Sequence, residues 1–254
     1  MLIQYASDFH LEFPQNRQWL KENPLEVKGD ILILSGDVMV LGVEDSIACD
    51  FLDWCSTNFK QTYIVPGNHE YYHGIDVADT LYAWERKLRD NVTYLNNRSV
   101  IIGDTELFFT TLWTKVPKED ENIVEKVMND CQLIQYKGNR LRACDFNTIH
   151  ETCFSWLTKA LQASTAPKQV VVTHHCPVQV EDPRYASNGL TKAFIIPLEQ
   201  FIADSSIKAW IFGHTHYNGA RGMDIGGCKI CTCQLGYIPD VICENFIRSA
   251  VIEL

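Results

Sequence analysis

Residues 2–10 read LIQYASDFH, a short apolar run that ends in an aspartate and a histidine two positions apart. The same arrangement recurs as DILILSGD at 30–37, TYIVPGNHE at 62–70, QVVVTHH at 169–175 and AWIFGHTH at 209–216. Short apolar runs bounded by turn residues are typical of buried strands in a parallel sheet. The sequence therefore predicts an α/β fold in which polar, ligand-type residues follow the strands.

Helical stretches separate the first runs. Residues 44–59 and 76–88 both place apolar side chains at helical spacing, so the first half is expected to alternate strand and helix. Further on, residues 100–102 and 107–112 are expected to pair as strands around a Gly103-Asp104 turn.

The second half continues the alternation. Residues 117–145 are the most polar stretch and are expected to form a mobile helical insertion. A long helix is expected at 147–161, with Asn147 or Thr148 as its N-cap, and closing strands at 229–233 and 246–254. Because no repeat or linker is evident, residues 1–254 are expected to form a single domain.

The composition excludes several classes of protein. The chain has 254 residues, of which 46% are hydrophobic and 21% charged, as in ordinary globular proteins. No apolar run approaches the length of a membrane span, so no membrane partner is expected. A formal charge of −10 argues against duplex nucleic acid as a partner. Because the sequence opens directly into an apolar strand, we expect a cytoplasmic protein with free thiols.

Six of the eight histidines directly follow predicted strands. They are His10, His69, His174, His175, His214 and His216. Since the carboxyl ends of parallel strands meet at one edge of a sheet, these loops are expected to converge on one site. Of the other two, His73 lies in helical or loop surroundings and His150 is expected on the surface.

The residue types at these strand ends suit a two-metal site. Asp8 and His10 can face the same side of an extended segment and chelate one metal. Asp37 follows a glycine and offers two oxygens that can bridge two cations, while Asn68 adds a neutral oxygen. Donors of nitrogen and oxygen without thiolate favour Mn, Fe, Zn, Co or Ni, and the residues do not choose among these metals.

Two metals about 4 Å apart can clamp the attacking and leaving oxygens of an in-line displacement at phosphorus, so phosphoester hydrolysis is the natural chemistry. Taken singly, each motif has a simpler explanation. A strand-end aspartate often caps a helix, and Gly36-Asp37 is ordinary turn chemistry. The whole set, in one order and always at a strand end, favours the catalytic interpretation.

The motifs resemble those of the calcineurin-like metallophosphoesterase superfamily. The pattern Asp-x-His, Gly-Asp, Gly-Asn-His-Asp/Glu, His and Gly-His-x-His is present from residue 8 to residue 216. The resemblance implies a two-sheet β-sandwich flanked by helices, the four-layer αββα arrangement. It also implies two divalent metal ions, and ligands for them. Asp8, His10 and His216 would hold the first metal, Asn68, His214 and a fifth-motif histidine the second, and Asp37 would bridge.

The fifth motif has two candidates, because His174 follows Thr173 and His175 precedes Cys176-Pro177. Adjacent strand residues face opposite sides, so only one of the two is expected to be a ligand. The resemblance makes His69 the histidine that meets the scissile phosphate, and Glu70 the carboxylate that orients its ring or holds it protonated.

The predicted function is hydrolysis of a small phosphodiester or phosphomonoester, nucleotide-like by preference, by a metal-bridging hydroxide that attacks in line. The alternative is a binding or scaffold module that keeps the fold without catalysis. The oligomeric state is not predicted. Tyr71, Tyr72 and His73 are candidates to line a pocket for a nucleobase or aryl leaving group, although ordinary packing is the commoner role of such residues, and four arginines are candidates for phosphate contacts. These are Arg140, Arg142, Arg184 and Arg221.

Overall fold

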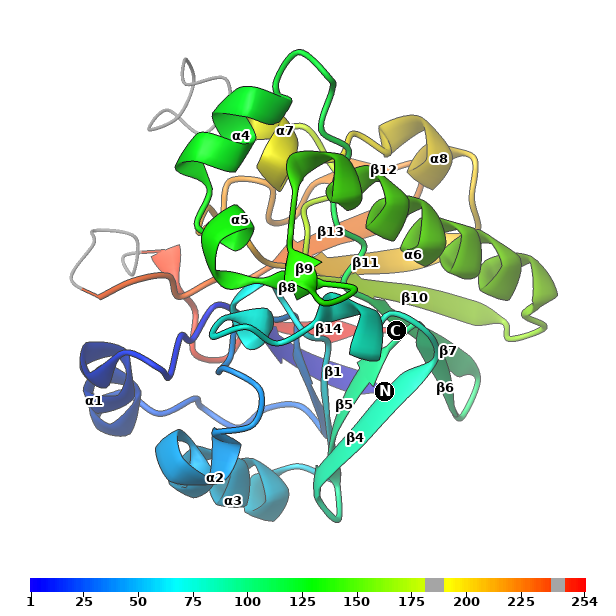
Figure 1. Cartoon of the computed structure of the whole chain (residues 1–254). Helices are drawn as coiled ribbons and strands as arrows, with labels where there is room; N and C mark the ends of the chain where they lie inside the picture. The colour runs from blue at the N-terminus through cyan, green and yellow to red at the C-terminus, as the bar shows by residue number, and fades with distance from the viewer. Residues whose placement is uncertain (181–189, 239–244) are drawn as a thin grey trace.

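Two six-stranded sheets face each other between layers of helices in the computed structural model, which describes residues 1–180, 190–238 and 245–254 (Figure 1). The arrangement is the αββα sandwich that the resemblance implies. Among the described residues, no helix combines the length and apolarity needed to cross a lipid bilayer.

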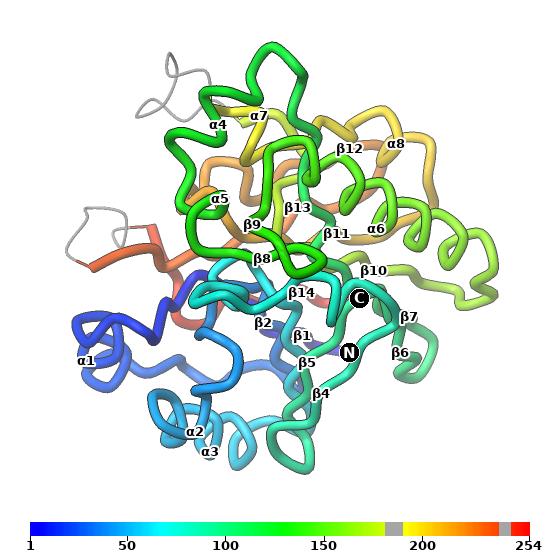
Figure 2. Tube along the Cα trace, viewed as in Figure 1, coloured from blue at the N-terminus to red at the C-terminus, as the bar shows by residue number. Residues whose placement is uncertain are grey.

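The first sheet has a parallel centre and antiparallel edges. Its strands, in spatial order, are β14 (Val251–Glu253), β1 (Leu2–Ala6), β2 (Ile31–Leu34), β3 (Gln61–Ile64), β5 (Val92–Asn96) and β4 (Trp84–Arg89). Because β14 pairs with β1, with Glu253 opposite Leu2, the two ends of the chain lie side by side (Figure 2).

The second sheet repeats this plan. Its strands, in spatial order, are β12 (Asp224–Ile225), β13 (Cys228–Thr232), β11 (Ile207–Phe212), β10 (Lys168–Thr173), β7 (Thr105–Thr110) and β6 (Arg98–Ile102). The strands β6 and β7 form the expected pair, and β14 is shorter than the predicted closing strand at 246–254.

Alternation along the strands assigns each side chain to a layer. In β2, Ile31 and Ile33 pack between the sheets, whereas Leu32 and Leu34 pack under the helices. The inner core continues in the second sheet with Val170 and Val172 of β10. A central parallel strand buried on both faces reads as a continuous apolar run, which is why these segments are recognisable in the sequence.

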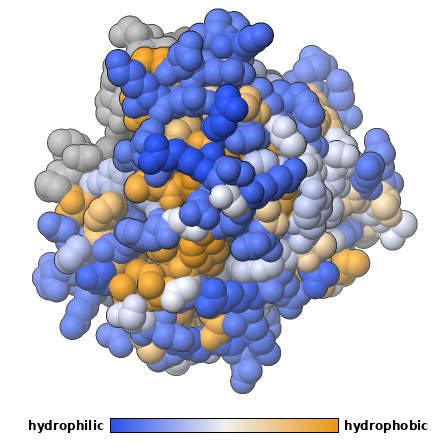
Figure 3. Space-filling model, viewed as in Figure 1, coloured by the Kyte–Doolittle hydropathy of each residue, from blue (hydrophilic) through white to orange (hydrophobic). Residues whose placement is uncertain are grey.

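Helices cover both outer faces, as Figure 1 shows. The first sheet is covered by α1 (Pro14–Glu22), α2 (Glu44–Ile47) and α3 (Cys49–Asn58). The second is covered mainly by α6 (Ala143–Ala163) and α8 (Glu199–Ala203), with the short α7 (Thr191–Phe194) beside them. The face seen in Figure 3 is largely hydrophilic, with apolar patches between the polar side chains.

The helix predicted at residues 76–88 is wrong. One 3-10 turn, η2 (Val77–Asp79), is followed by the edge strand β4. Asp76 caps the turn by accepting a hydrogen bond from the Ala78 N–H. Trp84 and Leu88 fit a period of two as well as a helical one, and pairing with β5 decides the conformation.

The segment 117–145 consists of α4 (Glu121–Val127), α5 (Asp130–Leu133) and a hairpin of β8 (Gln135–Tyr136) and β9 (Asn139–Arg140). It lies against the loop at residues 68–76, where Gly74 N–H donates to the Leu133 carbonyl. The helix α6 begins at Ala143, not at residue 147, where the Asp145 side chain accepts a hydrogen bond from the Arg142 backbone N–H. This segment therefore brings additional side chains to the carboxyl ends of the first sheet.

Candidate metal centre

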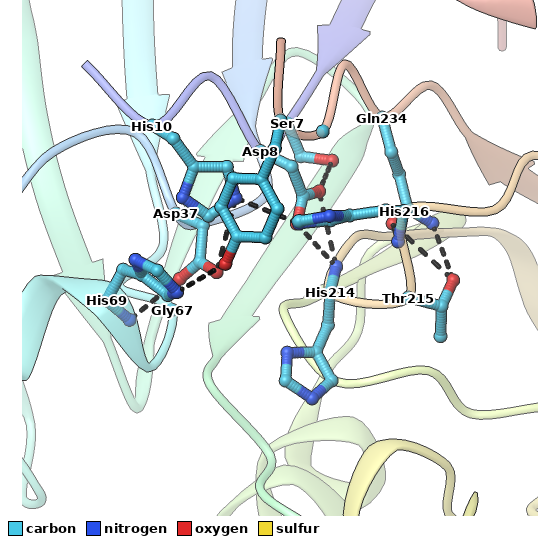
Figure 4. A network of polar contacts seen from close by, with 12 residues as sticks. Ser7, Asp8, His10, Asp37, Gly67, His69, His214, Thr215, His216 and Gln234 are labelled. Atoms are coloured by element: carbon cyan, nitrogen blue, oxygen red, sulfur yellow. Dashed lines mark hydrogen bonds and ion pairs between the residues drawn. The ribbon is translucent and has the colours of Figure 1, made fainter. Parts of the chain in front are cut away.

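The polar residues that follow β1, β2, β3, β10 and β11 meet at one edge of the sandwich. Figure 4 shows residues from the loops after β1, β2, β3 and β11. The first sheet supplies Asp8, His10, Asp37 and Asn68, and the second supplies His174, His214 and His216. The loops are tied together by Asp8, whose oxygens accept the His214 backbone N–H at 3.0 and 3.2 Å. Sequence positions more than 200 residues apart are thus held in direct contact.

One group of potential ligands comprises Asp8, His10, Asp37 and His216, whose donor atoms all lie within 4.8 Å of one another. The Nε2 atoms of His10 and His216 are 2.8 Å apart, and His216 Nε2 is 3.3 Å from Asp8 Oδ1. Burial lowers the pKa of His10 to about 4, so its ring is neutral near pH 7 and keeps a lone pair for a cation.

A second group comprises Asp37, His174 and His214. His174 Nε2 lies 3.0 Å from His214 Nδ1, 3.0 Å from Asn68 Oδ1 and 3.4 Å from Asp37 Oδ1. Asp37 belongs to both groups. Burial opposes its ionisation, but the neighbouring His174, His69 and His10 hold the pKa of this carboxyl well below its usual range.

The structure brings His174, and not His175, into this cluster. His175 points the other way, as expected for adjacent residues at the end of a strand. Its ring stacks on Trp113 with centroids 5.2 Å apart, and its Nδ1 lies 3.2 Å from the Thr111 carbonyl oxygen. Of the two candidates that the sequence leaves open, the structure therefore places His174 with the other potential ligands.

The donor set fits a pair of divalent cations. Nitrogen and oxygen lone pairs face one another at hydrogen-bond distance, and the buried His214 Nε2 has no hydrogen-bond partner among the described residues. Asp8, His10, Asp37, His214 and His216 all have left-handed backbones, with φ between 47° and 77°. Such conformations are costly outside glycine and cluster at functional sites.

Glycines of the motifs allow this close approach. A Cβ added at Gly213 would come within 2.7 Å of Asp8 Oδ2, and one added at Gly67 would overlap the Asp37 side chain. Gly36, which has φ of +90°, would in the same way overlap the ring of His174. The glycines before Asp37, Asn68 and His214 are therefore required by space, and Gly36 is required by its backbone conformation as well.

Glu70 does not contact His69, contrary to the expected role. Its carboxylate instead accepts backbone N–H groups of Asp37 at 2.9 Å, Val38 at 2.9 Å and Gly67 at 2.8 Å. Glu70 is fully buried, and burial together with the charge of Asp37 raises its pKa to about 8. It fixes the two ligand loops to each other because it follows His69 on a 3-10 turn that directs it inward.

Glu12 takes the place beside His69. Its Oε1 accepts a hydrogen bond from His69 Nδ1 at 2.7 Å and lies 3.2 Å from His10 Nδ1. Burial lowers the pKa of His69, but Asp37, Glu12 and Asp130 outweigh it and raise the pKa to about 9. His69 is therefore protonated near pH 7. The sequence does mark Glu12 as a candidate site residue, because it follows Asp8 and His10 at the same spacing of two residues.

Asp130, at the start of α5, holds the Asn68 amide. Its Oδ1 accepts from Asn68 Nδ2 at 2.9 Å and from the Tyr72 hydroxyl at 2.9 Å. With its nitrogen engaged in this way, Asn68 turns its oxygen toward His174. No local pattern marks Asp130, because it lies 62 residues from Asn68 in a polar segment.

A cavity of about 990 Å³ opens beside the two groups. Its described lining combines site residues with apolar and aromatic side chains. They include Asp37, Asn68, His69, Tyr72, Val127, Met128, Asp130, Phe194, Ile195, His214, His216, Tyr217 and Tyr237. Tyr72 stacks on His69 with ring centroids 4.1 Å apart, which supports its interpretation as a pocket residue.

The predicted arginine contacts are not found among the described lining residues of the cavity, none of which is lysine or arginine. Arg221 donates to the carbonyls of Thr232 and Asn245, and Arg142 pairs with Glu125. Arg140 is exposed on β9, and Arg184 lies outside the described residues.

His150 is buried, so its expected place on the surface is wrong. Its Nδ1 lies 3.1 Å from both the Leu112 and the Trp113 carbonyl oxygens. Those two residues have left-handed backbones at the end of β7, and His150 of α6 supports them.

Comparison with known proteins agrees with this geometry. The protein-family model of calcineurin-like phosphoesterases matches residues 1–218. A mimivirus protein from Acanthamoeba polyphaga mimivirus, named uncharacterized protein L509, is 27% identical over the whole of this chain and 96% of its own length.

A solved structure shares the fold. The crystal structure of a phosphopantetheinyl hydrolase from Mycobacterium tuberculosis superposes with a TM-score of 0.65 at 17% identity, covering 92% of this chain and 89% of the other. A dimetal phosphatase from Danio rerio gives a TM-score of 0.44 at 17% identity, covering 92% and 87%. Since the family model spans most of the sequence and all of its motifs, the chain belongs to the calcineurin-like phosphoesterase family.

Proposed function

We propose that this protein hydrolyses a small phosphodiester or phosphomonoester at a centre of two divalent metal ions. The observation that supports this most directly is the pair of ligand groups that share Asp37, next to a protonated His69 and an open cavity. Two adjacent cations with a proton donor beside them are the parts that phosphoester hydrolysis needs.

The proposed first site consists of Asp8, His10, Asp37 and His216, and the second of Asp37, Asn68, His174 and His214. The donor types suit Mn, Fe, Zn, Co or Ni. When bound, two such cations lower the pKa of water and neutralise charge on the phosphoryl group.

The protein's own groups would position and protonate the substrate. His69 lines the cavity and its Nε2 lies 2.9 Å from the Tyr237 hydroxyl oxygen, so it can supply a proton toward an oxygen of the phosphoester. Glu12 keeps the ring oriented through Nδ1, and Glu70 holds the loops that carry Asp37 and His69. Neither Glu12 nor Glu70 needs to move during the reaction.

The substrate class is part of the proposal. The cavity is far larger than a phosphate ion, so it can accept a leaving group of nucleotide size. The solved structure with the same fold is named a phosphopantetheinyl hydrolase, and a phosphopantetheinyl ester is also compatible with this volume. An acidic chain with a charge of −10 suits a small substrate better than duplex nucleic acid.

The test is hydrolysis of 4-nitrophenyl phosphate and bis(4-nitrophenyl) phosphate by the purified protein, supplied in turn with Mn, Fe, Zn, Co and Ni. We expect metal-dependent release of nitrophenol, and a loss of about 100-fold or more in kcat for His69→Ala with the metal content unchanged. His73→Ala is the matched control, because His73 is exposed. No release with any metal would refute the hydrolase and favour a binding module.

A further inference from the structure

Tyr237 reaches the candidate centre from outside the part of the chain that the family model matches. That match ends at residue 218, and Tyr237 lies beyond β13. Its hydroxyl oxygen is 2.9 Å from Nε2 of His69. It therefore contacts the one ring nitrogen of His69 that Glu12 does not engage.

The backbone on both sides of Tyr237 is fixed. Asn16 is fully buried, and its Nδ2 donates to the Gly236 carbonyl at 2.8 Å while its Oδ1 accepts the Ile238 N–H at 3.2 Å. The Gly236 N–H donates in turn to the Asp8 carbonyl at 3.0 Å. The buried Asn16 and the loop that carries Asp8 thus fix the backbone at Tyr237, and with it the direction of the tyrosine side chain.

The ring of Tyr237 lies across the first ligand group. Its centroid is 4.5 Å from that of His10 and 4.6 Å from that of His216, and the residue also lines the large cavity. The hydroxyl is consequently placed between His69, the first group and the space in which a substrate would bind.

The hydrogen-bond pattern sets the direction of its proton. When both nitrogens of His69 carry hydrogen, Nδ1 donates to Glu12 and Nε2 donates to the Tyr237 oxygen. The hydroxyl hydrogen of Tyr237 must then point away from His69. The two N–H groups of His69 thus donate in opposite directions, one to Glu12 and one to Tyr237, and the Tyr237 hydroxyl is left to donate elsewhere.

We propose that Tyr237 is a catalytic residue of the proposed phosphoesterase, and that its hydroxyl contacts the leaving-group oxygen of the substrate with His69 behind it. This role rests on the proposed function. The family motifs alone would give the contact with the leaving-group oxygen to His69. The proposal gives it to Tyr237, which lies outside those motifs.

The proposed step exchanges the ester bond to phosphorus for a bond from phosphorus to the oxygen of water. The oxygen of water forms a bond to phosphorus and gives a proton to solvent, while the ester P–O bond breaks and its electron pair stays on the leaving oxygen. That oxygen takes the hydroxyl proton of Tyr237, and the tyrosine oxygen takes the Nε2 proton of His69. His69 then regains a proton from solvent, so the net reaction is hydrolysis.

The test compares two substrates with different leaving groups, methyl 4-nitrophenyl phosphate and methyl phenyl phosphate, in wild type and Tyr237→Phe. Nitrophenolate leaves without a proton, whereas phenolate needs one. We expect kcat to fall about 100-fold for the phenyl ester and by less than about five-fold for the nitrophenyl ester. Tyr82→Phe is the matched control, because Tyr82 is exposed and is not among the described lining residues of the cavity.

Two further measurements separate this role from a structural one. Metal content should be unchanged in Tyr237→Phe, and the loss should largely disappear when His69 is already alanine, because the two residues act in series. Equal rates of wild type and Tyr237→Phe on both esters, or equal losses on both, would overturn the role while leaving the proposed function intact. A wild type inactive on every ester would instead overturn the proposed function.

Discussion

The carboxylate of Glu12 accepts a hydrogen bond from Nδ1 of His69 at 2.7 Å, and the same oxygen lies 3.2 Å from Nδ1 of His10. A residue outside the recognised motifs thus touches both a proposed metal ligand and the proposed proton donor. Its negative charge is one reason why the pKa of His69 is raised.

Glu12→Gln is expected to shift the alkaline limb of the pH profile of kcat/KM to lower pH. Burial lowers the pKa of His69, and carboxylates including Glu12 raise it to about 9, so removing one charge lowers that pKa. The protonated ring is then lost at a lower pH. Glu106→Gln is the control, because Glu106 bonds to Ser99 and Ser164 away from the cavity lining. An unshifted limb would contradict the assignment.

Metal stoichiometry should follow the division of ligands into two groups. Asp37 belongs to both groups, so Asp37→Asn should lose both ions. His216→Ala and His214→Ala should each keep about one ion, because each removes a ligand from one group only. Metal analysis after gel filtration measures this directly. Equal losses in the three variants would show that the groups do not act separately.

Asp130→Asn is expected to weaken binding of one metal about 10- to 100-fold, which is typical when the partner of a ligand is removed. The new amide can present a nitrogen to the Asn68 nitrogen, so Asn68 can turn its oxygen away from His174. Titration calorimetry with Mn or Zn measures the effect. Tyr72→Phe removes the other donor to the same oxygen and should leave affinity nearly unchanged.

His150 makes stability depend on pH in a defined direction. Burial lowers its pKa below 6.5, so the unfolded chain binds the proton more readily than the folded one. The contribution of neutral His150 to the free energy of unfolding is complete above about pH 7.5. It is lost as the pH falls through and below about 6.5. His150→Phe should therefore show a smaller drop in the free energy of unfolding between pH 8 and pH 6 than wild type.

The same variant should also be less stable at pH 8, by about 1–3 kcal/mol, because two buried carbonyls lose their donor. Urea unfolding at the two pH values gives both numbers. His73→Phe changes an exposed histidine and should show neither effect.

The parallel strands and the loops after them could be predicted because each strand is apolar along its whole length and stops at a polar motif. The choice between His174 and His175 could not be made, since alternation shows only that the two differ in direction. Asp130 and Tyr237 reach the centre through tertiary contacts that leave no periodic trace in the sequence.

The predictions that the structure contradicts are wrong for physical reasons of the same kind. The segment at 76–88 fits two periods, and the availability of β5 as a pairing partner decides between them. The family resemblance implies that Glu70 orients His69, yet the 3-10 turn separates the two side chains and leaves Glu12 in that position.

Each ligand group takes residues from both sheets. His216 joins Asp8, His10 and Asp37 in one group, and His174 and His214 join Asp37 in the other. During synthesis on the ribosome, neither group can therefore be complete until the chain beyond β11 has emerged and packed against the first half. A nascent or truncated chain that ends before His214 would hold only part of each group, so both metal sites can be complete only after the two sheets have packed together.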